Sequence, residues 1–308
     1  MIIDSFDDKS EAIINPHQKE NAPIVDACII TFSHIIEKFV LENYQCDKIA
    51  QFKFATGITP IYQIEYKGRK FAFYKTYVGA PACVGSIEDT LSEIRTNKYI
   101  VFGGCGCLNK EIAHGKVIIP TEAYRDEGTS YHYAPASDYI KIKNANIVEN
   151  FMKENEIPYV KGKTWTTDSF YRETINNFKK HKEDGCISVE MECSAIQAMC
   201  NFRKLNLYTF FTSGDLLDAP KWDERHKKGE ITGTQHDSGH FDIAIELAYY
   251  ITNQHIWKLK LNNTGDFKFF ECNYYIQYIL AECNFECSNT NIEEFWKSLR
   301  KEKRLKIA

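Results

Sequence analysis

The chain contains no long uninterrupted apolar segment. Its most continuous apolar runs, residues 27–32 and 99–102, are far shorter than the roughly 20 residues that a membrane-spanning helix needs. The segment that opens the sequence, residues 1–8, has neither a positively charged part nor an apolar part, so no secretory signal is expected there. We therefore expect a cytoplasmic protein that neither crosses nor binds a membrane.

An excess of positive charge and a regular pattern of cysteines are also missing. The 38 basic and 42 acidic residues leave a formal net charge of −4, which does not favour binding to nucleic acid. The 11 cysteines are odd in number and irregularly spaced, so we expect reduced thiols rather than a disulfide framework. Cys105 and Cys107 have no second pair, and His236 and His240 have no evident third ligand, so no metal site is predicted.

Apolar and aromatic side chains are plentiful. Hydrophobic residues make up 44% of the 308 positions and aromatic residues 14%, which is enough for a large core and too much for a disordered chain. A chain of this length fits one large α/β domain with an appendage. A small molecule is therefore a better expected partner than a nucleic acid.

Segments rich in β-branched and aromatic residues alternate with segments whose apolar residues have helical spacing. The expected strands are residues 24–32, 58–66, 70–78, 99–102, 117–120, 159–166 and 207–212. Helices are expected to begin at Ser33 and Ser86 and to cover residues 147–155, 191–203 and 241–250. Lys67-Gly68-Arg69, between two of the strands, predicts a hairpin. This alternation predicts an α/β sheet with helices packed on it.

The expected division of the chain is an N-terminal segment of residues 1–23, a main domain of residues 24–252 and a C-terminal extension of residues 253–308. The extension begins with a turn cluster and ends in a basic run at residues 297–306. Ser86 with Asp89 fits a capping box, which predicts a helix start. The strand at residues 99–102 is expected to end where the glycine cluster of residues 103–106 begins.

Several motifs, in this order and spacing, resemble the nucleoside phosphorylase family that contains uridine phosphorylase, the hexameric purine nucleoside phosphorylases and the methylthioadenosine nucleosidases. The resemblance covers about residues 24–252 and implies a single domain with a mixed central sheet flanked by helices. The motifs are Val78-Gly79-Ala80-Pro81, Gly103-Gly104-Cys105-Gly106, Thr167-Asp168-Ser169-Phe170-Tyr171, Val189-Glu190-Met191-Glu192-Cys193 and Ser213-Gly214-Asp215.

The resemblance implies a ribose site at the Val-Glu-Met-Glu motif. Cleavage of an N-glycosidic bond passes through a cation-like ribosyl centre, so a carboxylate near the sugar stabilises the transition state. Glu192 matches the carboxylate that accepts hydrogen bonds from the 2′ and 3′ hydroxyls. Met191 is expected to pack on the sugar, and Glu190 is a weaker member of the same acidic pair.

The resemblance also implies residues at the base. Phe170 matches the aromatic residue that stacks on the base, with Val189 and Tyr171 near it. Asp215 matches the acid that helps protonate N7 of a purine leaving group. The base-reading Gln and Arg of uridine phosphorylase would fall on Thr174 and Asn176, so a purine is favoured, although residues 128–135 look like a segment of uridine phosphorylase.

The arginines that hold phosphate in the family have no counterpart in this sequence. Their positions fall on Val101, on Thr56 or Gly57, and after the first strand, where Ser33 and His34 stand. Gly104 replaces the hydroxyl residue of the family's glycine-rich loop. Phosphorolysis to free base and ribose 1-phosphate is the first expectation, with inorganic phosphate as co-substrate and no other cofactor.

Three explanations for the missing arginines remain open. Phosphate could bind in a rebuilt pocket made by the backbone N–H groups of residues 103–106 with Ser33, His34 or Lys75. Water could replace phosphate, with His34 as the base that activates it, because an imidazole titrates near neutral pH. The protein could instead bind nucleosides without cleaving them.

His17 lies upstream of the first strand, at a distance similar to that of the family histidine that reaches a neighbour's ribose 5′-hydroxyl. The resemblance therefore implies a homodimer or a hexamer with a site shared between subunits.

Overall fold

The computed structural model describes residues 1–113, 116–218, 222 and 234–253, and for residues 234–238 the backbone alone. The chain divides into two units, residues 1–255 and residues 256–308. The second unit, and with it all of the predicted C-terminal extension except Asn253, lies outside the described residues. Within the described residues no helix is long and apolar enough to cross a membrane.

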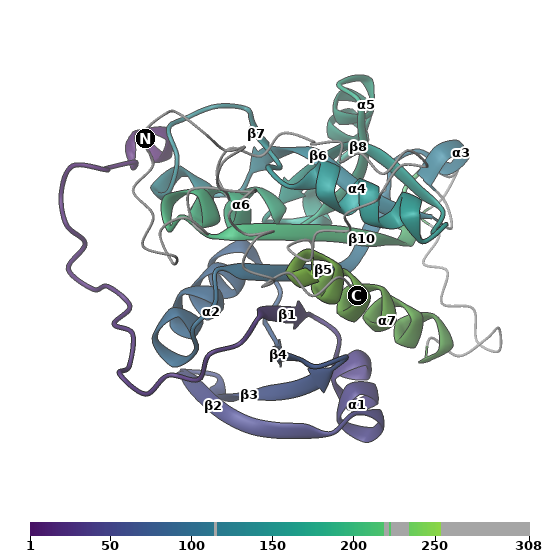
Figure 1. Ribbon diagram of the computed structural model, residues 1–308. Helices are drawn as coiled ribbons and strands as arrows, with labels where there is room; N and C mark the ends of the chain where they lie inside the picture. Colours follow the sequence, from purple (N-terminus) through teal and green to yellow (C-terminus); the bar gives the residue numbers. More distant parts are fainter. Residues whose placement is uncertain (114–115, 219–221, 223–233, 254–308) are drawn as a thin grey trace, which may run out of the picture. The chain divides into compact units, whose positions relative to one another are not determined.

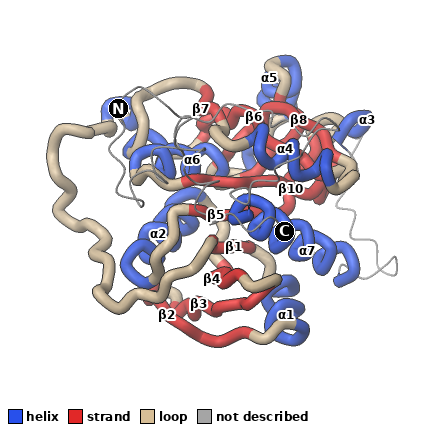
Figure 2. Tube along the Cα trace, viewed as in Figure 1, coloured by secondary structure: helices blue, strands red, loops and turns tan. Residues whose placement is uncertain are grey.

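The described strands form one mixed sheet, drawn as arrows in Figure 1 and in red in Figure 2. Its main path runs in the order β10-β6-β8-β9-β5-β1-β4-β3-β2, with β7 beside β6. The strands are β1 (Ala27–Thr31), β2 (Cys46–Phe54), β3 (Gly57–Tyr66), β4 (Arg69–Lys75), β5 (Lys98–Cys107), β6 (Val117–Asp126), β7 (Tyr139–Lys141), β8 (Tyr159–Thr167), β9 (Cys186–Glu190) and β10 (Asn206–Leu216).

Part of this sheet closes on itself. Strand β10 pairs with both β6 and β5, so β5, β10, β6, β8 and β9 form a ring. Strand β5 belongs to the ring and also pairs with β1, which leads to β4, β3 and β2. β5 is therefore the strand through which the two parts of the sheet are joined.

Helices cover the sheet on both sides. On one side α1 (His34–Asn43), α4 (Ala145–Glu154) and α7 (Thr234–Asn253) contribute to one hydrophobic cluster, and α1 and α7 lie against each other. On the other side α2 (Ala80–Glu93) and α6 (Cys193–Phe202) contribute to a second cluster. Strand β1 contributes side chains to both clusters, since Ile29 packs in the first cluster and Ile30 in the second. The remaining helical elements are η1 (Ile2–Asp4), α3 (Lys110–Ala113), η2 (Thr129–His132), η3 (Phe170–Arg172) and α5 (Ile175–Glu183).

The α/β class, the mixed central sheet and the flanking helices are as predicted from the sequence. The hairpin at Lys67-Gly68-Arg69 is confirmed, because β3 and β4 pair in antiparallel fashion on either side of it. Strands β2 and β9 and helix α5 were not predicted. The apolar residues of α5 are sparse, and the apolar and polar residues of β2 do not alternate regularly, so neither shows a strong periodic pattern.

Two predicted boundaries are wrong. Helix α2 begins at Ala80 rather than near Ser86, because Gly79 precedes it with a φ of 101° and Pro81 suits the first turn of a helix. Ser86 is buried inside α2, where its hydroxyl donates to the Cys83 carbonyl over 2.8 Å. The glycine cluster at residues 103–106 does not end a strand but continues β5 as far as Cys107.

The eight cysteines that the structure describes are free thiols, and seven of them are buried. This agrees with the expectation of reduced cysteines for that part of the chain.

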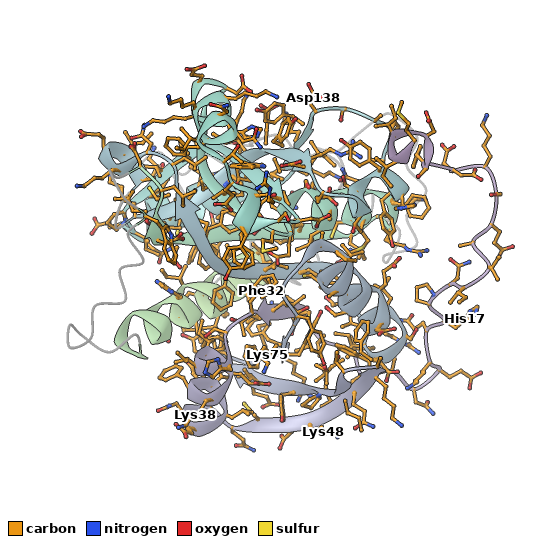
Figure 3. The ribbon with its side chains drawn as sticks, turned by 180° about the vertical axis from the view of Figure 1, so that it is seen from behind. His17, Phe32, Lys38, Lys48, Lys75 and Asp138 are labelled. Atoms are coloured by element: carbon orange, nitrogen blue, oxygen red, sulfur yellow. The ribbon has the colours of Figure 1, made fainter. Side chains whose placement is uncertain are left out.

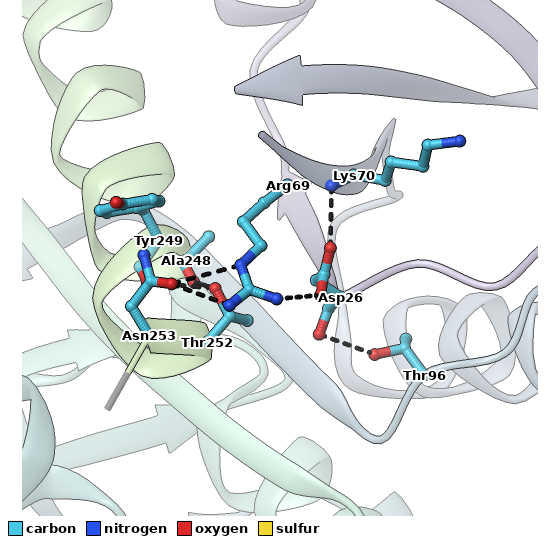
Figure 4. Close-up of polar contacts among 8 residues, drawn as sticks. All are labelled: Asp26, Arg69, Lys70, Thr96, Ala248, Tyr249, Thr252 and Asn253. Carbon is cyan, nitrogen blue, oxygen red and sulfur yellow. Dashed lines mark hydrogen bonds and ion pairs between the residues drawn. The ribbon is translucent and has the colours of Figure 1, made fainter. Parts of the chain in front are cut away.

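A polar network fastens the end of α7 to the sheet, as Figure 4 shows. The Arg69 guanidinium, at the start of β4, donates to Asp26 Oδ1 over 3.2 Å and to Asn253 Oδ1 over 2.9 Å. Asp26 Oδ2 accepts from the Lys70 backbone N–H over 2.9 Å. One guanidinium therefore joins the strand β4, the residue that precedes β1 and the last residue of α7.

Candidate active site

The predicted site residues gather where the pairing of β5 changes. Strand β10 lines one edge of β5 along its length, while β1 pairs with the other edge as far as Phe102 and β9 pairs with it from Gly106. The edge of residues 103–105 is therefore left without a strand neighbour. A cavity of about 1060 Å³ opens at this place. Its wall includes nine of the residues predicted from the sequence: Gly103, Gly104, Phe170, Tyr171, Val189, Glu190, Met191, Glu192 and Asp215.

Glu192 lies at the end of the segment that joins β9 to α6 and faces the first turn of α2. Its Oε1 accepts a hydrogen bond from the Gly79 backbone N–H over 2.6 Å. Gly79 has a φ of 101°, a conformation that other residues rarely adopt, so the sequence needs glycine here to aim this N–H. The positive end of the α2 dipole also favours a carboxylate at this place. A carboxylate has further lone pairs, so Glu192 can still accept from sugar hydroxyls.

Glu190 has a different environment from that of Glu192. Its Oε2 accepts from the backbone N–H groups of Glu192 and Cys193 over 2.7 and 2.6 Å, at the start of α6. Its Oε1 accepts from the Thr166 hydroxyl over 2.6 Å. Glu190 therefore caps α6 and holds the backbone of Glu192 in place.

The two acids are buried next to each other, and this changes their ionisation. Burial raises the pKa of Glu190 to about 7. Burial and the nearby Glu190 raise the pKa of Glu192 to about 8. Both carboxyl groups therefore have pKa values raised toward neutral pH.

Asp215, near the end of β10, lines the same cavity. Its Oδ2 accepts a hydrogen bond from Trp222 Nε1 over 2.7 Å. Its Oδ1 lies over Gly106, where an added Cβ atom would come within 3.4 Å of that oxygen and within 2.8 Å of Val189 Cγ1. Gly106 therefore leaves space in the cavity beside Asp215, because a side chain at position 106 would occupy that space.

The aromatic residues predicted to contact the base lie at the mouth of the cavity. Phe170 and Tyr171 belong to η3, and their ring centroids are 4.2 Å apart. Phe170 is 52% exposed, so its ring has surface free for stacking on a planar ligand. Met191 and Val189 add apolar surface to the wall.

Sequence reasoning missed four residues that build the site. Gly79, Gly106 and Trp222 act as described above, and the fourth, Glu173, lines the cavity three residues after Phe170. Gly79 and Gly106 belong to motifs noted in the sequence, but their roles depend on the residues that face them in the fold, which are Glu192 and Asp215. Glu173 and Trp222 belong to no motif, so no sequence signal marked them.

The cavity is rich in carboxyl groups and poor in cations. Among the described lining residues the acids are Glu173, Glu190, Glu192 and Asp215, and the single basic side chain is Lys179. No arginine lines the cavity within the described part of the chain, and Val101 stands at the wall where the family resemblance places one. The described residues contain no group of three or more His, Cys, Asp or Glu side chains that could hold a metal ion.

The remaining predicted residues are not among those that line the cavity. Ser33 is the N-cap of α1 and accepts from the Ile36 backbone N–H over 3.3 Å, and His34 is exposed beside it. Lys75 Nζ pairs with Glu37 over 3.0 Å. His17 lies on the N-terminal segment, well apart from the cavity residue Phe32 in Figure 3. Within this chain, then, the suggested phosphate pocket of Ser33, His34 and Lys75 does not coincide with the cavity.

The segment that looks like uridine phosphorylase is likewise absent from the cavity wall. Residues 128–135 wrap around the buried Arg125, whose Nε donates to Ser130 Oγ over 2.8 Å and whose Nη1 donates to the Pro135 carbonyl over 2.6 Å. These contacts give residues 128–135 a structural role, which is to pack around Arg125.

Comparison with known proteins agrees with this fold. A relative from Alkaliphilus metalliredigens (strain QYMF), named purine nucleoside phosphorylase DeoD-type, is 26% identical over 234 residues, which cover 73% of this chain and 95% of the relative. Proteins of the same name from Exiguobacterium sp. (strain ATCC BAA-1283 / AT1b) and Brevibacillus brevis (strain 47 / JCM 6285 / NBRC 100599) are 24% and 25% identical over 195 and 189 residues. These matches cover 61% and 59% of this chain and 78% and 75% of the relatives. A family model described as the phosphorylase superfamily matches residues 28–236, and the chain belongs to that superfamily.

Proposed function

We propose that this protein cleaves the N-glycosidic bond of purine nucleosides. The observation that carries the proposal is that Glu192, Asp215 and the half-exposed ring of Phe170 line one cavity. These are the groups that the two halves of a nucleoside need. The relatives described above are named purine nucleoside phosphorylases, which supports the same reaction class.

Glu192 acts on the sugar. As the bond between C1′ and the base nitrogen breaks, the electron pair leaves with the base and positive charge builds on the ribosyl ring. A fixed carboxylate stabilises that charge most when water is excluded and the carboxylate does not have to reorient. The Gly79 N–H and the capping of α6 by Glu190 hold Glu192 in this way.

Asp215 acts on the base. A departing purine anion is a poor leaving group until it receives a proton, and a carboxyl group near N7 can supply that proton. The indole N–H of Trp222 fixes one oxygen of Asp215 and leaves the other oriented toward Gly106 and the cavity.

We infer that water, rather than phosphate, takes up the ribosyl group. A phosphate dianion is bound in proteins by several cationic or N–H donors, of which arginine forks are the strongest. The described wall of this cavity offers Lys179 alone against four carboxyl groups. Water needs no such cradle, since a ribosyl cation is captured by a weak nucleophile, and the proton that water releases can pass to a carboxylate of the cavity.

The experiment is a panel of purine and pyrimidine nucleosides incubated with the full chain, with and without inorganic phosphate, in water enriched in ¹⁸O. Free base is measured by chromatography and the sugar product by mass spectrometry. We expect purine release that does not depend on phosphate, with ¹⁸O in the free ribose.

Each other outcome points to one alternative. Base release that requires phosphate and yields ribose 1-phosphate would leave bond cleavage intact and overturn the inference about water. Nucleoside binding by calorimetry with no base released would identify a binding protein instead of an enzyme. Release of uracil alone would overturn the assignment of purines.

A further inference from the structure

Glu127 is a buried carboxyl group to which the proposed reaction assigns no task. It directly follows β6, is 6% exposed and does not line the cavity. Arg125, two residues earlier, donates its hydrogen bonds to Ser130, Ser137 and two backbone carbonyls rather than to Glu127. A carboxylate that is buried without a bound cation is costly in a folded protein and calls for an explanation.

Both carboxylate oxygens of Glu127 accept hydrogen bonds, and one of these bonds comes from the start of α6. Oε2 accepts from the Ser130 backbone N–H over 2.9 Å, in η2. Oε1 accepts from the Ser194 hydroxyl over 2.8 Å. Ser194 is the second residue of α6, is completely buried and lies 67 residues further along the chain. Glu127 therefore joins the loop after β6 to the first turn of α6, which begins directly after Glu192.

A series of hydrogen bonds leads from Ser194 to the two acids of the Val-Glu-Met-Glu motif. The Ser194 backbone N–H donates to Thr166 Oγ1 over 3.1 Å, and the Thr166 hydroxyl donates to Glu190 Oε1 over 2.6 Å. An N–H can only donate, so the Thr166 oxygen accepts from Ser194 and its one hydrogen is left for Glu190. Glu190 Oε2 accepts from the backbone N–H groups of Glu192 and Cys193. The place of Ser194 therefore helps to determine where the backbone of Glu192 lies.

Burial makes this series of bonds sensitive to the loss of any one partner. Glu127, Ser194, Thr166 and Glu190 are all buried. A buried donor or acceptor that loses its partner cannot turn to solvent, so its neighbours have to shift. A displacement of about 1 Å at a catalytic group can lower a rate by about 10²-fold. A change at Glu127 should therefore be felt at Glu192, although Glu127 does not contact the cavity.

We propose that Glu127 is a positioning residue for the cleavage reaction. It fixes the start of α6 and, through the hydrogen bonds that end on Glu190, the place of the Glu192 carboxylate. This inference rests on the proposed function for the task of Glu192. It extends that function to a carboxyl group that governs the rate without contacting the substrate.

The test uses Glu127→Gln, Ser194→Ala and the double variant in the full chain, with Glu88→Gln as the matched control. Glutamine keeps the size of Glu127 but has one oxygen for two donors. Glu88 is likewise a half-buried acid in a polar network, since it accepts from Arg203 and Tyr133, and it lies outside the cavity wall.

The first measurement is made on the protein without ligand. Hydrogen exchange is followed by NMR for the Glu192 and Cys193 amides, which donate to Glu190. We expect these two amides to exchange faster by about 10-fold or more in Glu127→Gln and in Ser194→Ala. Glu88→Gln should leave their exchange unchanged, because it breaks a network that does not include Glu190.

The second measurement is kcat and KM for inosine and nitrophenyl riboside at about pH 8.5, above the pKa of about 8 of Glu192. In both single variants kcat should fall by about 10-fold or more with both substrates, because Glu192 acts on the sugar that they share. The double variant should lose no more than the more impaired single variant, because both substitutions break the same series of bonds. Glu88→Gln should keep the kcat of the parent.

The third measurement compares the binding of inosine and 2′,3′-dideoxyinosine by calorimetry, which reports on Glu192 without cleavage. A parent that cleaves no nucleoside but prefers inosine, with the preference lost in Glu127→Gln, overturns the proposed cleavage and leaves the positioning of Glu192 by Glu127 standing. Unchanged exchange of both amides in Glu127→Gln overturns the positioning role. Faster exchange with an unchanged kcat overturns its part in catalysis, as does an equal loss of kcat in Glu88→Gln. Losses that multiply in the double variant overturn the connection through Ser194.

Discussion

Glu192 and Asp215 act on different halves of a nucleoside in the proposed reaction, so kinetics can separate them. Glu192→Gln should lower kcat with every nucleoside by about 10²-fold or more, because the sugar is common to all of them. Asp215→Asn should impair inosine and adenosine far more than nitrophenyl riboside, whose leaving group needs no proton. Equal cleavage of inosine by Asp215→Asn and the parent would contradict the purine assignment and favour a uridine-type site.

The raised pKa of Glu192 predicts opposite effects of pH on activity and on stability. Activity needs the carboxylate, so kcat/KM should rise with pH and level off above about 8. The unfolded chain releases this proton near the ordinary value of 4.5 and the folded chain near 8, so the folded state binds more protons between these values. The contribution of Glu192 to the free energy of unfolding therefore falls as pH rises from about 4.5 to about 8.

Glu192→Gln removes the ionisable group and should therefore remove the fall in the free energy of unfolding that Glu192 causes as pH rises. At about pH 8.5 the variant should be more stable than the parent, by roughly 2 kcal/mol or more, although it is nearly inactive. Urea unfolding of parent and variant at about pH 5 and pH 8.5 measures the difference, which should be small at the lower pH. A variant less stable than the parent at the higher pH would contradict the raised pKa.

Among the elements, α7 is fastened to the sheet by the polar network of Arg69 as well as by its apolar face. Arg69→Met keeps much of the apolar stem but leaves Asp26 and Asn253 without the guanidinium. We expect a loss of about 1–2 kcal/mol in urea unfolding, since these groups are half-buried and the hydrogen bonds are charge-assisted. The kcat should not change, because Arg69 lies outside the cavity wall. A comparable loss in Lys38→Met, on the exposed face of α1, would show that the network has no special effect.

The burial and composition of the strands and helices explain why some of them could be predicted from the sequence and others could not. β1 and β5 are buried on both faces, so their apolar runs were visible in the sequence. β2 lies at an edge of the sheet and its apolar and polar residues do not alternate regularly, so its strand state depends on pairing with β3. Ser86 was wrongly predicted as a helix start because a serine hydroxyl suits an N-cap. In the structure its hydroxyl instead forms hydrogen bonds in the core with Thr76 and the Cys83 carbonyl. At such positions tertiary contacts outweigh the secondary-structure propensity of the local sequence.

For the whole molecule, the exposed rim of the cavity suggests that it is covered in the assembled protein. Val78, Phe170, Tyr171, Ile175 and Trp222 line the cavity and are between 52% and 88% exposed, which is unusual for large apolar side chains grouped in one place. We predict a dimer or a higher oligomer at micromolar concentration, in keeping with a site shared through His17. Light scattering should show Ile175→Asp shifted toward monomer, while Leu41→Asp on α1 retains the parent's mass. A parent that is strictly monomeric would contradict the prediction.

The sequence by itself determined the superfamily, the α/β class and nine of the residues that line the cavity. Glu192, Asp215 and Phe170 were identifiable because they belong to short motifs, in which the neighbours along the chain are also neighbours in the site. The core strands were identifiable because burial on both faces leaves a continuous apolar run.

Only the tertiary structure decided which groups act on those side chains. The role of Gly79 depends on Glu192, which is 113 residues away along the chain, and the pKa of Glu173 depends on burial and on Asp215 in β10. The excess of carboxyl groups over cations in the cavity, and the separation of Ser33, His34 and Lys75 from it, likewise follow from which strand edges meet at β5. Burial and Coulomb interaction depend on distance in space, and the folded sheet sets that distance between residues far apart in sequence.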